Sequence, residues 1–368
     1  MKTVIINGAN GYVASNFICD LLKQQYMVIA LVRANKQDPE DRMNDALNLI
    51  NDGTAVDTTN LEVYNYSLLD DDFAMDKNII KSIFSNSVDY FHFAASLKYD
   101  EKSIDEIFST NIEGVENSIK VFSKYATKNS RFFYIGTAYS CGWLNSTFKE
   151  KFYRNDDISA FRNYYEQSKR FAENIIKENI QKNGLDAHII RLSQVVGNHE
   201  TGVTKTDYGI FDFAKRIYSL ATRYPNKIVR VHVDPDSTQN LIPIDIVSKH
   251  LTKVIKETEV PDIMNFVSKK SIPNSHIIEI LNQLVPMNII PVKKLEQKDM
   301  NSIERLVSVA MSFTESYTST NISFDTRERD KFVDCQETGL DNSSVARMLE
   351  YFIKKLSKKT RKKKPVAA

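Results

Sequence analysis

The chain has 368 residues, of which 42% are hydrophobic and 26% charged, and its formal net charge at pH 7 is +2. This composition is typical of a globular protein with one large domain and a smaller one, and it excludes a fibrous or largely disordered chain. Basic residues are concentrated in 354–368, so the rest of the chain is acidic overall and we expect no nucleic-acid-binding surface.

The apolar runs of the sequence are short. The first, within residues 1–6, is too short for the core of a signal peptide, and no later run reaches the length of a membrane span. We therefore expect a cytoplasmic protein with no membrane span. Three widely separated cysteines, Cys19, Cys141 and Cys335, predict neither a disulfide framework nor a metal site, and we interpret them as buried packing residues.

The first motif is a glycine loop. Residues 2–6 are rich in β-branched side chains and predict a strand, and the apolar residues that follow Ala14 recur at helical spacing. Between strand and helix, Gly8 can make the tight turn, Gly11 can let the backbone approach a pyrophosphate, and Ala14 can let the helix pack closely. We interpret the segment as a dinucleotide-binding loop, with the phosphates at the helix N-terminus, rather than as a plain turn.

The second predicted strand, Met27–Val32, ends at Arg33. In a dinucleotide-binding unit the adenosine ribose lies at this point, where an acidic residue binds the 2′-hydroxyl of NAD and an arginine suits the 2′-phosphate of NADP. Arg33 therefore favours NADPH over NAD. The alternative is a solvated charge at the end of a strand.

Further buried strands are predicted at 61–65, 88–93 and 131–135. The small residues Ala94 and Ala95 follow the 88–93 strand and leave room for a cofactor. His92 falls inside that strand, so we interpret it as a packed core residue rather than a catalyst.

Thr137 follows the strand 131–135, at the edge where ligands collect in parallel sheets, and its hydroxyl could donate a hydrogen bond to a developing oxyanion. Ser140 is the competing candidate. On the helix predicted next, Tyr165 and Lys169 are four residues apart and share a face, so the ammonium is expected to favour the ionised phenol. A phenol perturbed in this way can exchange a proton closer to neutral pH.

The spacing of Tyr165 and Lys169 is weak evidence by itself. A second pair with the same spacing, Tyr351 and Lys355, lies in the lysine-rich terminal region, where no glycine loop or hydroxyl motif accompanies it. We interpret that pair as a solvated helix face.

Strands and helices alternate through a sixth strand at 187–192, which predicts an α/β fold with a doubly wound parallel sheet of the Rossmann type. We expect an NADP-binding domain over 1–197, to which segments of about 228–268 return. A smaller, mostly helical C-terminal substrate-binding cap is expected over 198–227 and 269–353. Residues 354–368 are expected to form a disordered basic tail, with docking of an acidic partner as the alternative.

Several separated motifs occur in a consistent order: Gly8-x-x-Gly11-x-x-Ala14, His92-x-Ala94-Ala95, Asn111-x-x-Gly114, Thr137-Ala138, Tyr165-x-x-x-Lys169 and Leu241-Ile-Pro-Ile-Asp245. Together they resemble the extended short-chain dehydrogenase/reductase superfamily over roughly residues 1–270. The chain looks most like the branch that holds fatty-acyl-CoA reductases and the thioester (carboxylic acid) reductase domains of peptide and polyketide assembly lines. The strings that indicate this branch include Leu31-Val-Arg33-Ala34, Arg191-Leu-Ser-Gln-Val-Val-Gly197 and Phe324-Asp325.

The resemblance implies an NADPH-dependent reductase that transfers hydride to the carbonyl of an acyl thioester or an aldehyde. Thr137 would orient the carbonyl, Tyr165 would donate the proton, and Lys169 would lower the pKa of Tyr165 and bind the nicotinamide ribose. An acidic acyl-carrier protein is the implied partner for a carrier-bound substrate. The implied cofactor contacts are Gly8, Asn10, Gly11, Tyr12, Val13, Arg33, Leu68, Ala94, Ala95, Asn111, Tyr165, Lys169 and Val195.

The sequence departs from the superfamily pattern near the adenine. Ala14 replaces the usual third glycine, Tyr66-Ser67-Leu68 stands in place of Gly-Asp-Leu, and Leu192 replaces a common proline. These departures concern adenine affinity more than catalysis.

Three other functions share the fold: a nucleotide-sugar epimerase or dehydratase, a ketone or alcohol dehydrogenase, and a dinucleotide-sensing regulator without turnover. Sugar dehydratases place acidic residues just after the threonine, whereas Ala138 and Tyr139 follow it here. Arg33 favours a dissociable NADPH over the tightly held NAD of such enzymes. The intact set of Thr137, Tyr165 and Lys169 disfavours a regulator.

Overall fold

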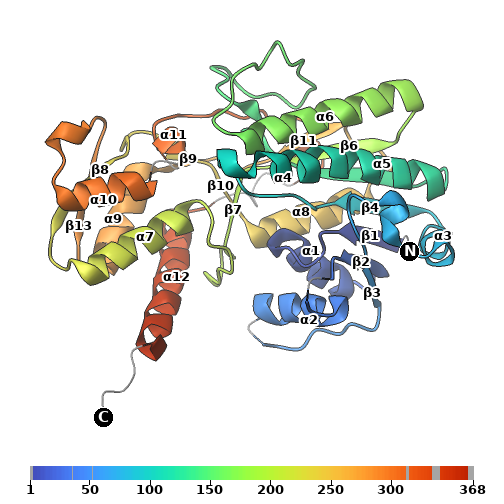
Figure 1. Ribbon diagram of the computed structural model, residues 1–368, viewed down its shortest axis with the longest axis horizontal. Coiled ribbons are helices and arrows are strands. Elements are labelled where there is room, and N and C mark those ends of the chain that lie inside the picture. The colour runs from blue at the N-terminus through green and yellow to red at the C-terminus, as the bar shows by residue number, and fades with distance from the viewer. Residues whose placement is uncertain (1–2, 35, 52, 312–314, 334–339, 364–368) are drawn as a thin grey trace. The chain divides into compact units, whose positions relative to one another are not determined.

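The computed structural model describes residues 3–34, 36–51, 53–311, 315–333 and 340–363. The chain forms two compact units, each made of separate segments (Figure 1). The first unit comprises Met1–Ser193, Ile246–Val267 and Phe324–Cys335. The second comprises Gln194–Asp245, Ser268–Ser323 and Gln336–Ala368.

The first unit is built on a seven-stranded sheet with the strand order β11-β6-β5-β4-β1-β2-β3. All neighbouring strands pair in parallel, which confirms the predicted doubly wound Rossmann sheet. The strands are β1 (Thr3–Asn7), β2 (Val28–Val32), β3 (Leu61–Asn65), β4 (Val88–His92), β5 (Arg131–Thr137), β6 (Ala187–Leu192) and β11 (Ile263–Phe266).

Helices cover both faces of this sheet (Figure 1). Neighbouring side chains of a strand point to opposite faces, so Tyr90 packs against Phe122 of one helix layer while Phe91 packs against Phe17 of the other. The helices of the first unit are α1 (Tyr12–Lys23), α2 (Pro39–Ile50), α3 (Lys77–Ile83), α4 (Ile104–Phe108), α5 (Gly114–Tyr125), α6 (Tyr164–Asn183) and α8 (Ile244–Lys256). Short turns of other helix types are η1 (Asp71–Ala74), η2 (Glu101–Ser103), η3 (Ser109–Glu113), η4 (Ala138–Cys141) and η6 (Arg329–Lys331).

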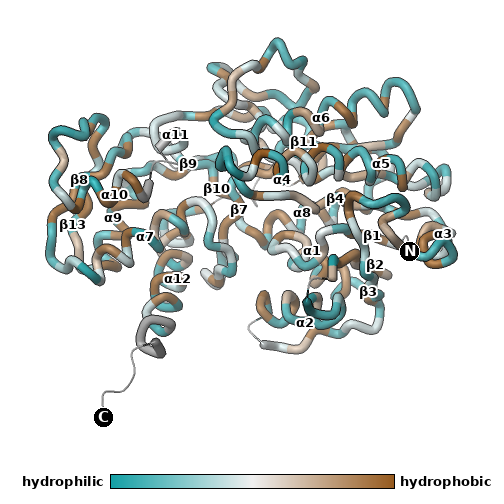
Figure 2. Tube along the Cα trace, viewed as in Figure 1, coloured by the Kyte–Doolittle hydropathy of each residue, from teal (hydrophilic) through white to brown (hydrophobic). Residues whose placement is uncertain are grey.

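The second unit is mostly helical, as predicted, and contains three two-stranded sheets. Its helices pack around an apolar core to which Val229 and Val231 of β8 contribute, and apolar residues alternate with polar ones along α7 and α12 (Figure 2). Its strands pair as β7 (Gln194–Val196) with β10 (Leu241–Pro243), β8 (Ile228–His232) with β13 (Asn288–Val292), and β9 (Thr238–Gln239) with β12 (Ile272–Pro273). Its helices are α7 (Ile210–Arg223), α9 (Asn274–Leu284), η5 (Gln297–Asp299), α10 (Ser302–Met311), α11 (Glu315–Thr318) and α12 (Asn342–Lys363).

The unit boundaries differ from the expected ones in two places. Of the segment 228–268, only Ile246–Val267 returns to the first unit, because β8 and β10 pair with β13 and β7 rather than with the seven-stranded sheet. Phe324–Cys335, expected in the cap, also belongs to the first unit, where Phe324 bridges to Phe148.

Residues 354–363, which were expected to belong to a disordered tail, instead continue helix α12. The apolar stripe of this helix, which includes Leu349, Phe352 and Ile353, extends to Leu356, and Leu356 packs against the core of the second unit. This packing stabilises the helix despite its lysines. The remainder of the expected tail, 364–368, lies outside the described residues.

Candidate active site

The glycine loop lies between β1 and α1. Gly8 has a φ of +62°, and a Cβ at this position would lie 2.7 Å from the backbone nitrogen of Ala94, so only glycine fits. Gly11 is the N-cap of α1, so Tyr12 and Val13 form the start of the helix, where backbone N–H groups point out of the helix end. A Cβ on Gly11 would approach the Gly8 carbonyl to 3.2 Å. This cradle fits the backbone approach that a pyrophosphate requires.

Asn7, directly before the loop, is a buried residue that the sequence analysis missed. Its Oδ1 accepts hydrogen bonds from the backbone N–H groups of Phe93 (2.8 Å) and Ala94 (3.0 Å). Its Nδ2 lies 2.9 Å from Nδ1 of His92. Asn7 therefore fixes the segment after β4, including half-buried Ala94 and Ala95, against the glycine loop. A lone polar residue at the end of an otherwise apolar strand was the available signal.

His92 is fully buried, and burial lowers its pKa to about 3. Its ring lies between the aromatic residues Phe132 and Tyr134. A neutral, packed histidine agrees with the interpretation of His92 as a core residue.

The carboxyl ends of β1, β2 and β3 bring the predicted adenosine-side residues to one edge of the sheet. Arg33 is exposed after β2, and its backbone carbonyl accepts a hydrogen bond from the Arg42 guanidinium. The Tyr66 hydroxyl accepts a hydrogen bond from the backbone N–H of Gly8 at 3.2 Å. Tyr66 and Arg42 are therefore two residues of this edge that were not among the predicted cofactor contacts.

The side chains of Leu68 and Asn111 contact other residues of the first unit. The Leu68 side chain covers Gly114, where a Cβ would lie 2.6 Å from Leu68 Cδ2. Asn111 lies in the π-helical turn η3, and its Nδ2 donates to the Ser96 carbonyl (3.1 Å) and the Ser168 hydroxyl (2.9 Å). Asn111 thus ties the segment after β4 to α6. The cofactor contacts expected for both residues stay predictions, as does that of half-buried Asn10.

Thr137 and Tyr165 come together at the end of β5. Thr137 is the last residue of that strand, and its Oγ1 accepts a hydrogen bond from the Tyr139 N–H at 3.2 Å. Tyr165 lies in the first turn of α6, whose N-cap Asn163 accepts from the Glu166 N–H at 3.0 Å. Burial raises the pKa of Tyr165, and the neighbouring Thr137 hydroxyl acts in the opposite direction. The Thr137 hydroxyl itself donates a hydrogen bond to the Leu192 carbonyl at 3.4 Å.

Ser140, the competing candidate, has its hydroxyl engaged within the protein. It is fully buried, and its hydroxyl lies within hydrogen-bonding distance of the Thr137 carbonyl (2.8 Å) and Glu173 Oε1 (2.9 Å). Thr137 is therefore the hydroxyl placed beside Tyr165.

Lys169 is buried, and its Nζ donates to the Ile135 carbonyl at 3.2 Å and lies 4.8 Å from the centre of the Tyr134 ring. Burial lowers the pKa of Lys169 to about 7, while the negative charge of Glu173 acts in the opposite direction. Burial of the Tyr165 phenol raises its pKa, and the expected effect of Lys169 on that phenol stays a prediction.

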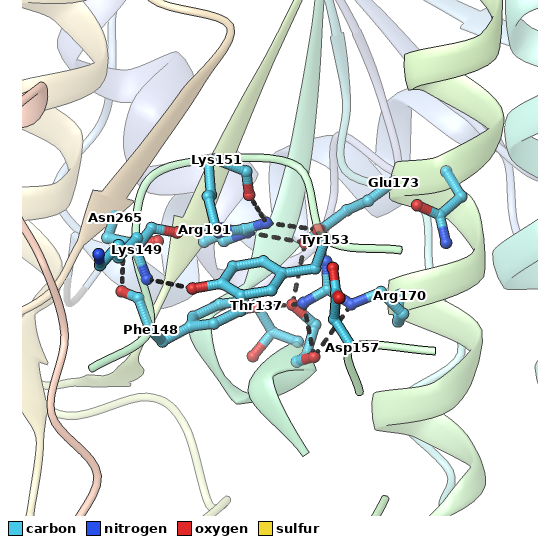
Figure 3. Close-up of polar contacts among 12 residues, drawn as sticks. Thr137, Phe148, Lys149, Lys151, Tyr153, Asp157, Arg170, Glu173, Arg191 and Asn265 are labelled. Atoms are coloured by element: carbon cyan, nitrogen blue, oxygen red, sulfur yellow. Dashed lines mark hydrogen bonds and ion pairs between the residues drawn. The ribbon is translucent and has the colours of Figure 1, made fainter. Parts of the chain in front are cut away.

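Glu173, Arg170 and Arg191 form an ionic cluster close to Thr137 (Figure 3). Glu173 of α6 receives hydrogen bonds from Arg170 (2.6 Å) and from Arg191 of β6 (2.9 and 2.6 Å), and all three side chains are fully buried. Arg191 also donates to the carbonyls of Lys149 and Lys151. This cluster was not predicted from the sequence, although Glu173 lies four residues after Lys169, just as Lys169 lies four residues after Tyr165.

The remaining predicted features are placed as follows. Val195 lies in β7 of the second unit, so its contact with the nicotinamide stays a prediction. Cys19 and Cys141 are buried, and Cys335 lies outside the described residues. The described part of the chain contains no group of three or more His, Cys, Asp or Glu side chains placed to hold a metal ion. Among the helices of the described residues, none has the length and apolarity needed to cross a membrane.

A doubly wound parallel sheet that gathers a glycine loop, a Thr–Tyr pair and a buried lysine along one edge is the arrangement of NAD(P)-dependent enzymes of the extended short-chain dehydrogenase/reductase type. The chain belongs to the family described as male sterility protein, whose model matches residues 6–251. Curated protein sequences give no significant match.

Solved structures of two kinds share the fold. The terminal R domain from the myxalamid PKS-NRPS biosynthetic pathway is 16% identical, with a TM-score of 0.78 over 96% of this chain and 91% of that one. A thiolation-reductase di-domain from an archaeal non-ribosomal peptide synthetase is 17% identical, with a TM-score of 0.73 over 97% of this chain and 76% of the other. UDP-glucuronic acid 4-epimerase from Bacillus cereus, solved with NAD, is 15% identical, with a TM-score of 0.66 over 97% and 98%.

Proposed function

We propose that the protein is an NADPH-dependent reductase that acts on an acyl thioester or on the aldehyde that a thioester yields. The observation that carries the proposal is the proximity of the Thr137 hydroxyl, at the end of β5, to the Tyr165 phenol, at the edge of the sheet where ligands bind. Ala138 and Tyr139, rather than acidic residues, follow Thr137, so the site lacks the groups that a sugar dehydratase uses to remove water.

In this proposal Thr137 and Tyr165 bind the oxygen of the substrate carbonyl. Bound NADPH supplies the hydride that reaches the carbonyl carbon. The Tyr165 proton then passes to the oxygen, on which negative charge develops. Burial raises the pKa of Tyr165, which keeps the phenol protonated near neutral pH, as a proton donor must be. With a thioester, the resulting hemithioacetal breaks its carbon–sulfur bond and releases the aldehyde and a thiol.

The cofactor preference follows from Arg33. Its exposed guanidinium stands at the end of β2, where it can make charge-assisted hydrogen bonds to a 2′-phosphate. Gly8, Gly11, Tyr12 and Val13 would hold the pyrophosphate. Lys169, on the same helix face as Tyr165, would bind the nicotinamide ribose.

An acidic acyl-carrier protein is the proposed partner for a carrier-bound substrate. One of the structures that share the fold is described as a thiolation-reductase di-domain from an archaeal non-ribosomal peptide synthetase. The exposed Lys354 and Lys358 of α12 provide positive charges that such a partner could meet.

An NADPH-oxidation screen tests the proposal. Purified protein is mixed with acyl-CoA, acyl-carrier and aldehyde substrates, and in parallel with UDP-sugars. We expect NADPH consumption with a thioester or an aldehyde and no conversion of the sugars. Conversion of a UDP-sugar without net consumption of NADPH would instead identify an epimerase.

A further inference from the structure

Glu173 lies at the centre of the buried ionic cluster and on the same helix as Tyr165 and Lys169. We propose that Glu173 is a positioning residue for the proposed reduction: through Ser140 it fixes the turn that carries Thr137, and it places a negative charge beside Lys169 on the same face of α6. This inference rests on the proposed function for its kinetic part only.

Helix geometry places Glu173 next to the site. Tyr165, Lys169 and Glu173 are spaced four residues apart on α6 and therefore share one face, with Glu173 one turn beyond Lys169. A Cβ added to Gly136 would lie 3.7 Å from Glu173 Oε1, so the carboxylate abuts the residue immediately before Thr137. The Glu173 side chain thus lies between α6, which carries Tyr165, and β5, which carries Thr137.

Ser140 connects the carboxylate to the Thr137 turn. Its one hydroxyl hydrogen is shared between the Thr137 carbonyl and Glu173 Oε1. Its own carbonyl accepts hydrogen bonds from Arg170 Nε (3.2 Å) and Nη2 (2.7 Å). The turn Ala138–Cys141 is therefore held by α6 through the side chain and the carbonyl of Ser140.

The charge balance of the cluster is unusual for a purely structural device. Two buried guanidinium groups share one buried carboxylate, which leaves a surplus positive charge. Burying such groups has a large desolvation cost, and well-packed apolar side chains of similar volume are often at least as stabilising. The arginines keep the pKa of Glu173 below its usual value despite its burial, so the carboxylate remains charged.

The negative charge of Glu173 also acts on Lys169. The groups that interact electrostatically with Lys169 come from three elements: Tyr134 of β5, His92 of β4 and Glu173 of α6. Burial keeps His92 neutral by lowering its pKa, and it raises the pKa of the Tyr134 phenol, so Glu173 supplies the negative charge. Glu173 therefore favours the protonated form of Lys169.

A matched control exists at the opposite end of the same strands. Asp89 of β4 and Arg131 of β5 form another buried ion pair, with hydrogen bonds of 2.8 and 2.7 Å. Arg131 is the first residue of β5 and Thr137 is the last. Asp89→Asn therefore removes a buried carboxylate from an arginine without touching the catalytic turn.

The experiment compares Glu173→Gln, Ser140→Ala and Asp89→Asn by steady-state kinetics and by NMR titration of lysines labelled with 13C at Cε. The Lys169 signal is assigned by its absence from Lys169→Met. For Glu173→Gln we expect kcat to fall roughly 10- to 100-fold with the KM for NADPH nearly unchanged, because the hydroxyls lose their alignment. The midpoint of the Lys169 titration should move to lower pH.

The other variants separate positioning from stability. Ser140→Ala should lower kcat and leave the Lys169 midpoint in place, and Asp89→Asn should lower the melting temperature with kcat and the midpoint unchanged. A wild-type Lys169 midpoint in Glu173→Gln, or an equal loss of kcat in Asp89→Asn, would overturn the inference. If Glu173→Gln does not fold, an unchanged kcat in Ser140→Ala overturns it. The NMR titration needs no substrate, so it remains decisive even if the proposed reaction is not the one catalysed.

Discussion

The Thr137 hydroxyl at the carboxyl end of β5 lies beside the Tyr165 phenol in the first turn of α6, close enough to act on the pKa of that phenol. The two groups come from separate elements, β5 and α6. A carbonyl oxygen placed beside them would meet two hydroxyl groups, of which the Tyr165 phenol supplies the proton that is transferred.

Replacing Tyr165 by phenylalanine removes that proton while keeping the ring. Because a general acid typically contributes about 10²- to 10⁴-fold, we predict a fall in kcat of that order with NADPH binding retained. Steady-state turnover measurements and an NADPH-binding titration test this prediction. Tyr164→Phe, on the neighbouring residue of the same helix, is the control and should keep wild-type turnover. Equal activities of the two variants would show that Tyr165 is not the acid.

Arg33→Ala tests the choice of cofactor. A hydrogen bond to a charged group is worth about 1.5–3 kcal/mol, so the KM for NADPH should rise roughly 10- to 100-fold, while the KM for NADH should stay nearly constant. Arg154→Ala, which removes an exposed arginine of the loop before α6, should change neither. Equal use of NADPH and NADH by the wild-type protein would contradict this role.

Lys169→Met should abolish turnover and yet raise stability. The folded-state pKa of Lys169, about 7, lies below its ordinary value of 10.5, so the cost of burying the charge is fully present below pH 7 and disappears as pH rises to 10.5. Near neutral pH the gain should be at least about 1 kcal/mol, since one pKa unit corresponds to about 1.4 kcal/mol.

Urea denaturation at about pH 6 and about pH 9 measures this gain, which should be larger at the lower pH. Lys182→Met removes an exposed lysine of the same helix and should give no such gain. A destabilised Lys169→Met at both pH values would mean that the lysine is not buried as a charge.

Lys354 and Lys358 on α12 test the carrier interaction. Both side chains are exposed, and Lys354 pairs with Glu350 at 2.6 Å. Changing both lysines to glutamate should slow reduction of a carrier-bound thioester at low salt and leave the matching free thioester unaffected. Because exposed charges are screened over about 10 Å at 0.1 M salt, the difference should shrink as salt is added.

Lys77 and Lys81 on α3 have the same spacing and are also exposed, so the corresponding double change on α3 is the matched control. A slower reaction with both substrates, or an equal effect of the α3 variant, would exclude docking through α12.

Features fixed by local sterics or by spacing could be predicted from the sequence. Gly8 is an example, because the residue type itself reports a backbone that no side chain tolerates. The strand that ends at Thr137 and the helix that carries Tyr165 followed from periodicity and from the resemblance to a known superfamily. The proximity of Thr137 to Tyr165 was not predictable from spacing, since the two residues belong to separate elements.

The contacts that were missed also join distant parts of the chain. Asn7 bonds the segment after β4, Tyr66 bonds the glycine loop, and Glu173 bonds Arg191 of another strand. A hydropathy pattern reports which side chains are buried but not which polar partners they find. At α12 the pattern was informative, but the lysines were given more weight than the apolar stripe that ends at Leu356.

The most direct test of the reductase assignment follows the hydride itself. NADPH carrying deuterium at the transferred position of the nicotinamide is supplied with an acyl thioester, and the product is analysed by mass spectrometry. The account predicts an aldehyde, or the alcohol formed from it, that carries deuterium on the former carbonyl carbon, and it predicts loss of this product in Tyr165→Phe. A product without deuterium, or a labelled cofactor left intact while a nucleotide sugar is epimerised, would contradict it.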